Sequence, residues 1–324
     1  MRLALSFACS LCCFAVLPHG ALGQAKPDPN ALVLSDDLSG PDFTRSGGLY
    51  YKKNFEQSAG RVKFGSSEIR DGRRVLELAI EPVCPPDGKE CSERAEIWER
   101  NDLLADYDKG VWYAFSLKFG DPLPTDSRRY LMAQWKRQIP AGIEGDFSPF
   151  LALRLRHGHL YVTVETELLP LLKTADGSVK TACAGNELRV SNRSADKQTR
   201  AIVALEPGVQ WPDEGGIIGC SDQIAVTSRS PLPSARSGWI DFAFYSKPGP
   251  AGDGHIEIIA NGKWVATVKG RIGHAIDSPK QYFKFGPYRE AMAGRWTLYY
   301  ERFRRSPNCQ DAAPAETCAA VSGP

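Results

Sequence analysis

The feature that most constrains the fold of this chain is an alternation of apolar and polar residues with a period of two. It recurs in many short segments separated by turns, among them VWYAFSLKF, LALRLR, HLYVTVETE, WIDFAFYS, HIEIIA and KWVATV. Such alternation is typical of β-strands with one buried face. His157-Gly158 and Asn261-Gly262 join consecutive segments and predict two hairpins, the second with a type I′ turn.

Helical patterns are weak by comparison. No segment carries a sustained apolar stripe with helical spacing, and the best candidates for short helices are Leu168–Lys173 and the neighbourhood of Asp277. Many short strands without internal repeats predict an all-β protein. We expect a β-jelly-roll sandwich of two antiparallel sheets, with a concave face that forms a substrate groove.

The N-terminal segment has the features of a secretory signal peptide. Arg2 provides a positive start, Leu3–Leu17 is a short apolar stretch, and Ala21-Leu22-Gly23 supplies small residues. The apolar stretch is too short and too weakly flanked to remain as a membrane anchor. We expect cleavage near Gly23 and an exported mature protein, secreted or periplasmic, without a membrane partner.

The mature chain, residues 24–324, is predicted to be a single domain, because its length of about 300 residues suits one large β domain. Residues 169–236 are polar and interrupt the alternation, so we expect an insert, tied by a disulfide, over one edge or mouth of a sheet. The formal net charge of +2 falls to about +1 without Arg2. This balance favours no particular partner, and we expect no nucleic acid.

The cysteines predict three disulfides. Three of the nine lie in the predicted signal peptide, and an even number in the rest of an exported chain indicates disulfides. Six cysteines allow fifteen pairings. Their clustering favours Cys84–Cys91, Cys183–Cys220 and Cys309–Cys318. A metal site is the alternative, but the spacings lack the CxxC form that zinc sites favour, and we predict no metal site.

The first segment with candidate functional residues is SERAEIWER. Arg94, Glu96 and Trp98 share one face of the expected strand, while Ala95 and Ile97 turn inward. A guanidinium can bind a carboxylate through two parallel hydrogen bonds, and the glutamate two residues further can orient it. A surface ladder of charged pairs beside an exposed tryptophan is the competing interpretation, and this segment alone favours it.

The second segment is YLMAQWKRQ, in which Gln134 and Lys136 share a face. Gln134 can donate a hydrogen bond to an anionic oxygen, with Lys136 beside it as a further cation. A half-buried strand with a solvated polar face explains this segment equally simply, and for Gln134 alone that explanation is preferred.

The third segment, YFKFGPYRE, carries two phenols and a lysine on one face, at Tyr282, Lys284 and Tyr288, and two core-facing phenylalanines on the other. Gly286-Pro287 requires the strand to bend or end, because proline donates no ladder hydrogen bond. A cation close to a phenol stabilises the phenolate, so Tyr288 would be able to take and return a proton. Two tyrosines that merely cover the sheet are an equally good explanation of this segment alone.

Taken together, the three segments place polar groups on one face of the predicted sandwich. A concave sheet would bring Arg94, Gln134 and Tyr288 over one groove. Trp98 and Tyr282 would flank it as stacking surfaces. Such a groove suits an extended acidic sugar chain.

The three motifs, in this order, resemble those of the jelly-roll polysaccharide lyases. Alginate lyases of that architecture carry an R-x-E strand, a Q-x-H strand and a Y-x-K-x-G-x-Y strand, and the heparin lyase I-like and glucuronan lyase families share the sandwich. This chain has RAE at 94–96, QWK at 134–136 and YFKFGPY at 282–288. The resemblance extends from about Val75 to Arg304, with the insert unmatched.

The resemblance implies cleavage of a uronate-containing acidic polysaccharide by β-elimination. Such a lyase removes the proton at C5, beside the carboxylate, and expels the oxygen at C4. Arg94 and Gln134 would bind the carboxylate, and Tyr288 would protonate O4 and also act as base where both groups lie on the same side of the ring. The further candidate substrate contacts are Glu96, Trp98, Tyr282, Lys284 and Arg289.

Lys136 stands where the alginate-type pattern has a histidine. A lysine acts as a base only if burial or neighbouring cations lower its pKa substantially, so we expect Lys136 to be a further catalytic-site charge on the carboxylate. Tyr288 is then the first candidate base and His159 the second. No cofactor is expected to be required, although calcium is left open. The expected substrate of this predicted monomer is glucuronan, alginate, a heparin-like chain or an exopolysaccharide.

Two other functions are alternatives to elimination. A non-catalytic carbohydrate-binding β-sandwich needs the aromatic and cationic residues but no proton donor, and the missing histidine keeps this alternative open. A glycoside hydrolase needs two carboxylates on one face, whereas Glu96 and Glu99 point to opposite faces of their strand.

Overall fold

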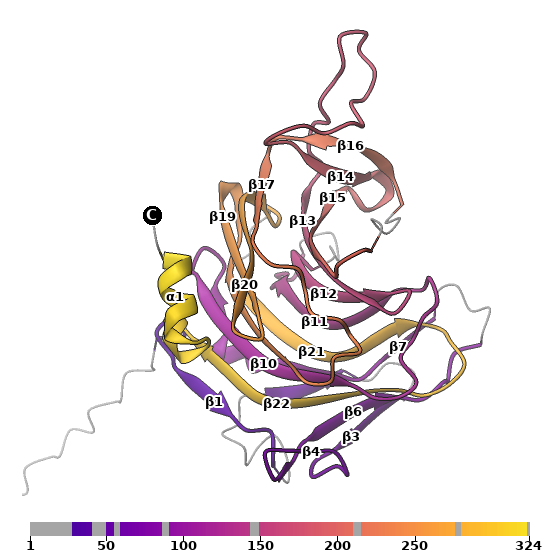
Figure 1. Ribbon diagram of the computed structural model, residues 1–324, viewed down its shortest axis with the longest axis vertical. Helices are drawn as coiled ribbons and strands as arrows, with labels where there is room; N and C mark the ends of the chain where they lie inside the picture. Colours follow the sequence, from indigo (N-terminus) through magenta and orange to yellow (C-terminus); the bar gives the residue numbers. More distant parts are fainter. Residues whose placement is uncertain are drawn as a thin grey trace, which may run out of the picture.

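The computed structural model is built almost entirely from β-strands in two packed layers (Figure 1). It describes residues 28–40, 50–54, 59–85, 91–142, 149–209, 215–275 and 280–322. The predicted signal peptide, residues 1–23, and the short helix predicted near Asp277 lie outside these ranges.

Sheet A forms one layer and has nine strands within the described ranges. In spatial order they are β17 (Ile224–Ser228), β20 (Lys263–Ile272), β19 (Gly249–Ala260), β18 (Ile240–Lys247), β10 (Val111–Phe119), β22 (Trp296–Ser306), β6 (Leu76–Ile80) and β3 (Gly60–Lys63), with β1 (Leu34–Asp36) also paired to β22. Neighbouring strands are antiparallel.

Sheet B forms the other layer, with eleven strands in the described part of the chain. In order they are β16 (Ile217–Ser221), β14 (Leu188–Arg193), β15 (Gln198–Leu205), β13 (His159–Glu167), β12 (Leu151–Arg156), β11 (Tyr130–Arg137), β21 (Lys280–Glu290), β8 (Glu96–Glu99) and β2 (Tyr50–Asn54), with β7 (Ser92–Arg94) and β9 (Ala105–Asp106) also paired to β21. A separate small hairpin consists of β4 (Ile69–Arg70) and β5 (Arg73–Arg74).

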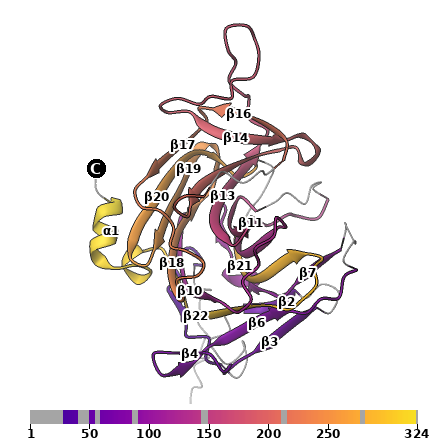
Figure 2. The same cartoon turned by 45° about the vertical axis from the view of Figure 1, so that its right-hand side comes forward.

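Sheet B is strongly curved. It bends from β21 and β11 through β13 towards β14 and β16, so that its face turned away from sheet A is the concave one (Figures 1 and 2). The predicted all-β sandwich of two antiparallel sheets is confirmed. The strand that carries the third motif, β21, lies between β11 and β8 of this curved sheet and also pairs with β7 and β9.

Aromatic rings fill the space between the sheets. Phe283 of β21 lies 4.7 Å from Trp135 of β11 and 5.6 Å from Phe115 of β10, measured between ring centroids. Phe285 packs against Tyr300 of β22 at 4.8 Å. Such ring pairs add stabilisation beyond the apolar area that they bury, and they fix the inward face of β21.

Both predicted hairpins are present. β12 and β13 meet at His157-Gly158, where φ is 51° and 77°, and β19 and β20 meet at Asn261-Gly262, where φ is 49° and 70°. Positive φ at both central residues is the geometry of a type I′ turn, whose twist matches that of the paired strands.

β21 bends at Gly286-Pro287 but does not end there. Gly286 has a φ of 123°, and a Cβ at this position would lie 2.1 Å from the carbonyl oxygen of Ala95. Only glycine therefore allows this close approach of the two backbones. Ala95 N–H donates to the Pro287 carbonyl oxygen at 2.9 Å, and the register with β11 shifts at this point. The pairing with β7 and β8 stays in register through this point, and Tyr288, four residues after Lys284, lies on the same face.

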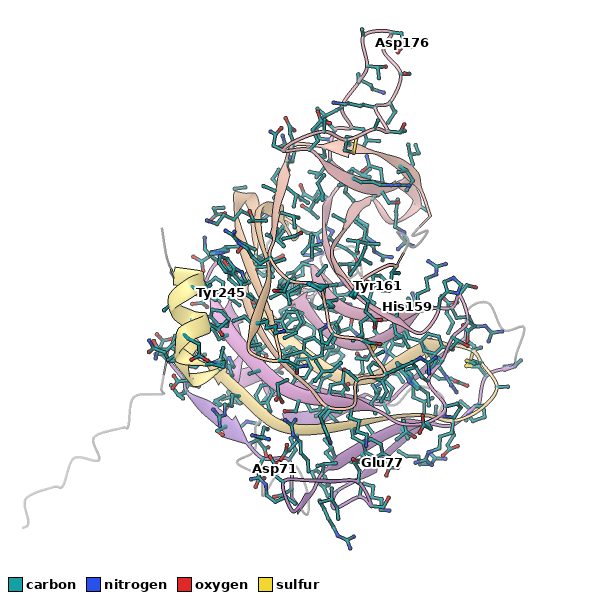
Figure 3. All side chains as sticks on the ribbon, viewed as in Figure 1. Asp71, Glu77, His159, Tyr161, Asp176 and Tyr245 are labelled. Atoms are coloured by element: carbon teal, nitrogen blue, oxygen red, sulfur yellow. A yellow bond between two sulfur atoms is a disulfide. The ribbon has the colours of Figure 1, made fainter. Side chains whose placement is uncertain are left out.

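The described part of residues 169–236 forms four strands, where we expected an excursion over a sheet edge. β14, β15 and β16 extend sheet B beyond β13, and β17 is the edge strand of sheet A. A loop with Asp176 at its tip projects from the molecule (Figures 1 and 3). The strands were missed because short segments such as LRVSNR and IAVTS offer too few apolar residues to display an alternation.

The helix predicted at Leu168–Lys173 is absent, and the prediction was wrong. This segment bonds to the neighbouring strands instead, since Leu172 N–H donates to the Cys220 carbonyl at 2.8 Å. A helix that the sequence did not indicate, α1 (Ala315–Ser322), packs near β20 at the C-terminal end. In the described residues no helix has the length and apolar character needed to cross a bilayer.

All three predicted disulfides are confirmed. Two join cysteines 7 and 9 residues apart, and the third joins a loop before β14 to β16, with Cα–Cα distances of 5.4–5.8 Å. The pairs are Cys84–Cys91, Cys183–Cys220 and Cys309–Cys318. Three disulfides are typical of a protein that folds in an oxidising compartment.

Candidate active site

The three sequence motifs meet on the concave face of sheet B. Antiparallel register places Tyr288 directly opposite Arg94, and Lys284 opposite Trp98 on one side and Gln134 on the other. Directly opposed residues of antiparallel strands project to the same face. Lys136 is likewise opposed to Tyr282. Eight of the nine residues predicted as catalytic or substrate-binding therefore lie together.

A buried carboxylate organises the floor of this site. Glu96 is fully buried, and its Oε2 accepts a hydrogen bond from Lys284 Nζ at 2.9 Å and lies 3.3 Å from Arg94 Nε. Its Oε1 accepts a hydrogen bond from the side-chain amide of Gln134. One carboxylate thus holds two cations and an amide donor in place, and Glu96 is itself too deep to be a first choice for a substrate contact.

Burial changes the chemistry of Lys284. Its side chain is 2% exposed. Burial, together with the nearby cations Arg94 and Lys136, lowers its pKa from the usual 10.5 to about 8, although Glu96 acts in the opposite direction. Lys284 is therefore charged at neutral pH but is close to its titration range.

Two arginines surround the phenol of Tyr288. The Arg94 guanidinium lies over the ring, 4.0 Å from its centroid. Arg129 lies 4.9 Å from the same centroid and donates a hydrogen bond from Nη2 to the phenol oxygen at 3.0 Å. Arg129 was missed from the sequence because it precedes β11 in a loop, where alternation assigns no face. A doubled Arg128-Arg129 was the only available indication.

An aromatic pair forms the wall on the other side of Lys284. Trp98 and Tyr282 stack with centroids 5.1 Å apart, and Lys284 Nζ lies 4.8 Å from the Trp98 ring. Both rings and Lys136 remain half-buried. Sugar rings pack well against exposed aromatic faces, so this end of the site offers a stacking surface beside a cation.

Arg289 lies away from this face, and its predicted role in substrate binding needs correction. Its side chain is 1% exposed and donates from Nε to Glu93 Oε2 at 2.6 Å. It also donates to the Gly294 carbonyl at 2.7 Å. The odd-numbered residues of β21 face sheet A, so Arg289 is a structural residue that anchors the turn after β21.

Glu99 also faces the interior, as the alternation predicted. Its Oε2 accepts a hydrogen bond from Phe283 N–H at 2.7 Å, and Arg305 Nε lies 3.5 Å from its Oε1. Burial raises its pKa, while Arg305 opposes that shift. Glu96 and Glu99 therefore cannot act as the paired carboxylates of a glycoside hydrolase.

Three described histidines lie outside the three motif strands. His159 Nδ1 lies 3.1 Å from Glu206, at the hairpin end of β13, and His255 bonds to Glu257 in sheet A. His274 is buried, and burial together with Arg137 lowers its pKa to about 4. Among the described residues, no group of three or more His, Cys, Asp or Glu side chains is arranged to hold a metal ion.

Comparisons with known proteins agree with this arrangement. A family model described as polysaccharide lyase matches residues 44–304. No curated protein matches. The fold is similar to that of an endo-β-1,4-glucuronan lyase from the fungus Trichoderma reesei, with a TM-score of 0.55, 16% identity, and coverage of 87% of this chain and 98% of that chain.

The alginate lyase vAL-1 from a Chlorella virus is a more distant structural neighbour, with a TM-score of 0.45, 12% identity, and coverage of 84% of this chain and 98% of that chain. The family match extends over most of the chain and includes all three motif strands. The resemblance inferred from the motifs is therefore confirmed. This chain belongs to the polysaccharide lyase family and is a polysaccharide lyase with a jelly-roll fold.

Proposed function

We propose that this lyase is exported and cleaves a uronate-containing polysaccharide by β-elimination, with Tyr288 as the proton-transferring group. The observation that carries the proposal is the phenol held between two guanidiniums, Arg94 and Arg129, on the same concave face as a stacked aromatic pair. The Trichoderma reesei enzyme of similar fold is a glucuronan lyase, which supports a uronate polymer as the substrate class.

The reaction breaks two bonds and forms a double bond. A base removes the proton at C5 of the uronate, the electron pair forms the C4–C5 double bond, and the C4–O bond breaks. The departing oxygen takes a proton. In the Tyr288 scheme the phenolate accepts the C5 proton and the phenol returns one to O4, so the side chain ends in its starting protonation state.

The cations of the site suit the charge that develops in this reaction. Loss of the C5 proton adds negative charge to a group that already carries a carboxylate. Arg94 and Arg129 border the position of Tyr288, where they would stabilise both the phenolate and the enolate-like transition state. Gln134 has a second N–H besides the one given to Glu96 and would donate it to a carboxylate oxygen.

Lys136 and Lys284 would act as charges and not as bases. Lys284 is bound to Glu96, and its position fixes the carboxylate that in turn orients Arg94. Lys136 is half-buried opposite Tyr282 and would contact the substrate carboxylate directly. His159 is engaged with Glu206 at the hairpin end of its strand, so Tyr288 is preferred as the base.

Export is supported by two independent features. The N-terminal residues have the composition of a signal peptide. Three disulfides tie loops and strands in the rest of the chain, and such bonds persist in secreted and periplasmic proteins. Detection of the mature protein outside the cytoplasm, with an N-terminus near Gln24, tests this part.

The test of the reaction is the appearance of unsaturated product. Purified protein is incubated with glucuronan, alginate and heparin-like chains, and absorbance is followed at roughly 235 nm, where the conjugated product absorbs. Tyr288→Phe removes the proton but leaves the ring, so turnover should fall by about 100-fold or more while substrate affinity is retained.

Tyr299→Phe is the matched control, because Tyr299 lies on β22 of sheet A and pairs with Lys118 and Glu77 there. This variant should turn over substrate at the wild-type rate. Near-normal turnover in Tyr288→Phe would remove Tyr288 from the mechanism. Absence of unsaturated product with every uronate polymer, despite binding, would refute the elimination itself.

A further inference from the structure

An ion pair lies directly behind the proposed catalytic residues, on the inner face of the same two strands. Glu93 of β7 is opposed to Arg289 of β21, and the next opposed pair is Arg94 and Tyr288. Successive residues of a strand point to opposite faces. The pair Glu93–Arg289, here called the inner ion pair, therefore faces sheet A, and each of its members is the covalent neighbour of a residue that faces the groove.

The inner ion pair is enclosed by protein. The Glu93 side chain is 0% exposed and the Arg289 side chain 1% exposed, and Arg289 Nε donates a hydrogen bond to Glu93 Oε2 at 2.6 Å. Separation of the two strands at this point would leave two buried charges without partners, which is strongly unfavourable. The pair thus fixes the spacing of β7 and β21 one residue away from Arg94.

The Glu93 carboxylate also binds the chain that precedes β7. Its Oε1 accepts hydrogen bonds from Val83 N–H at 2.7 Å and from Cys84 N–H at 3.0 Å. Cys84 is joined by a disulfide to Cys91, which immediately precedes β7. A single carboxylate therefore connects β21, through Arg289, to both ends of this disulfide-bonded segment.

β7 depends on such an anchor more than β21 does. β7 has only three residues, Ser92–Arg94, and within the described part of the chain it pairs only with β21, beside which it lies in Figures 1 and 2. β21 has eleven residues and pairs with β11 from Gln281 to Arg289. A short strand with few ladder hydrogen bonds opens easily. The position of Arg94, at the end of β7, therefore depends on the side chain that holds its neighbour.

We propose that the inner ion pair positions Arg94, because it holds β7 where the Arg94 guanidinium lies 4.0 Å from the centroid of the Tyr288 ring. The inference rests on the proposed function for the roles of these two residues in the reaction. Glu96 lies against the guanidinium end of Arg94, whereas the inner ion pair fixes the backbone from which that side chain extends. A displacement of about 1 Å can lower the rate of an enzyme by about 100-fold.

The test uses a double variant that removes both charges of the inner ion pair. Glu93→Gln keeps an oxygen that can accept the backbone hydrogen bonds, and Arg289→Met keeps an apolar stem. No buried charge is stranded, so the thermal midpoint should stay close to that of the wild type. On the uronate polymer that yields most unsaturated product, kcat should fall about 10- to 100-fold, while KM changes less than about 3-fold.

The same substitutions in an Arg94→Ala background distinguish positioning from general damage. If the inner ion pair acts through Arg94, its removal should lower kcat by less than about 2-fold once the Arg94 guanidinium is absent. An equal loss of kcat in both backgrounds would overturn the proposal. A wild-type kcat in the double variant would also overturn it.

Two single variants complete the comparison. Arg289→Lys keeps the positive charge opposite Glu93 but loses the fork of donors, so its kcat should lie between those of the wild type and the double variant. Glu301→Gln is the matched control on sheet A, where the Glu301 side chain is 2% exposed and binds Arg73 at 2.9 Å and Arg302 at 3.0 Å. It also loses a buried carboxylate, but it should keep the wild-type kcat.

Crystal structures of the wild type and the double variant give a readout that needs no turnover. The distance from Arg94 Cζ to the centroid of the Tyr288 ring should increase from 4.0 Å by about 1 Å or more. If the wild type forms no unsaturated product but this distance increases, the positioning stands and the proposed elimination fails. If the wild type forms product and the double variant keeps both the distance and kcat, the elimination stands and the positioning is overturned.

Discussion

Removal of the buried carboxylate at the centre of the site should destabilise the whole protein. In Glu96→Gln the side chain keeps its shape and loses its charge. Lys284, 2.9 Å from it and 2% exposed, then loses its counter-ion, and Arg94 loses a carboxylate at 3.3 Å. Removal of one partner of a buried ion pair costs about 3–5 kcal/mol. We expect the lower end, about 3 kcal/mol, because Lys284 can release its proton.

The assay is urea unfolding with the disulfides intact, in parallel with Glu68→Gln. Glu68 pairs with Lys118 at 2.7 Å, but the two side chains are 22% and 31% exposed. A pair of this kind is worth about 0–1 kcal/mol. Both carboxylates bind a lysine at a similar distance, but Glu96 is buried and also holds Arg94 and Gln134. The difference between the two variants therefore measures the contribution of the buried network.

A double variant adds a second check. Glu96→Gln combined with Lys284→Met also removes the buried lysine. This double variant should be more stable than Glu96→Gln alone, because apolar replacement of both partners of a buried ion pair changes the free energy of unfolding little. An unfolding free energy for Glu96→Gln within about 1 kcal/mol of the wild type, or equal to that of Glu68→Gln, would refute the argument.

Two further predictions concern the same strand. With a pKa of about 8, Lys284 is charged below that pH and neutral above it, so kcat should decline as the pH rises beyond about 8. Lys284→Arg should move this fall in kcat to higher pH. A fall in kcat at the same pH in the variant would assign the titration to another group. Gly286→Ala places a Cβ 2.1 Å from the Ala95 carbonyl oxygen at a φ of 123°. This variant should lower the free energy of unfolding by about 1–3 kcal/mol and reduce kcat. Wild-type values of both quantities would show that the backbone at this position can shift without cost.

Strand alternation predicted which residues share a face, and it did so reliably where strands are long. The inward phenylalanines of β21 and the outward Tyr282 and Lys284 lie as their parity requires. The same rule also assigns Arg289 to the inner face, so the erroneous substrate contact came from its nearness to Tyr288 in sequence and not from the pattern.

Depth below the surface was not predictable from parity. Glu96, Gln134 and Lys284 face the groove as expected, yet they are 0–2% exposed and bond to each other. Burial depends on the curvature of sheet B and on the side chains that cover these residues, which come from other strands. A two-residue period shows to which face of the sheet a side chain points, and it does not show how deeply that side chain is buried.

The residues that the sequence left unassigned lie outside regular alternation. Arg129 precedes its strand, and the strands of 169–236 are short and polar. The C-terminal helix α1 was missed because its sequence, AETCAAVS, has no clear apolar stripe. These elements gain their structure from contacts with distant parts of the chain, which local propensity does not contain.

The burial of the Glu96 carboxylate affects how the activity of this lyase depends on ionic strength. Mobile ions screen charges that face solvent within about 10 Å at 0.1 M ionic strength, and they screen buried pairs much less. Glu96 and Lys284 are enclosed by protein, whereas Arg129, which would meet the polymer in the proposed function, is 40% exposed. A high salt concentration would therefore slow the association of the polysaccharide with the enzyme while leaving the rate of the chemical step on bound polysaccharide largely unchanged.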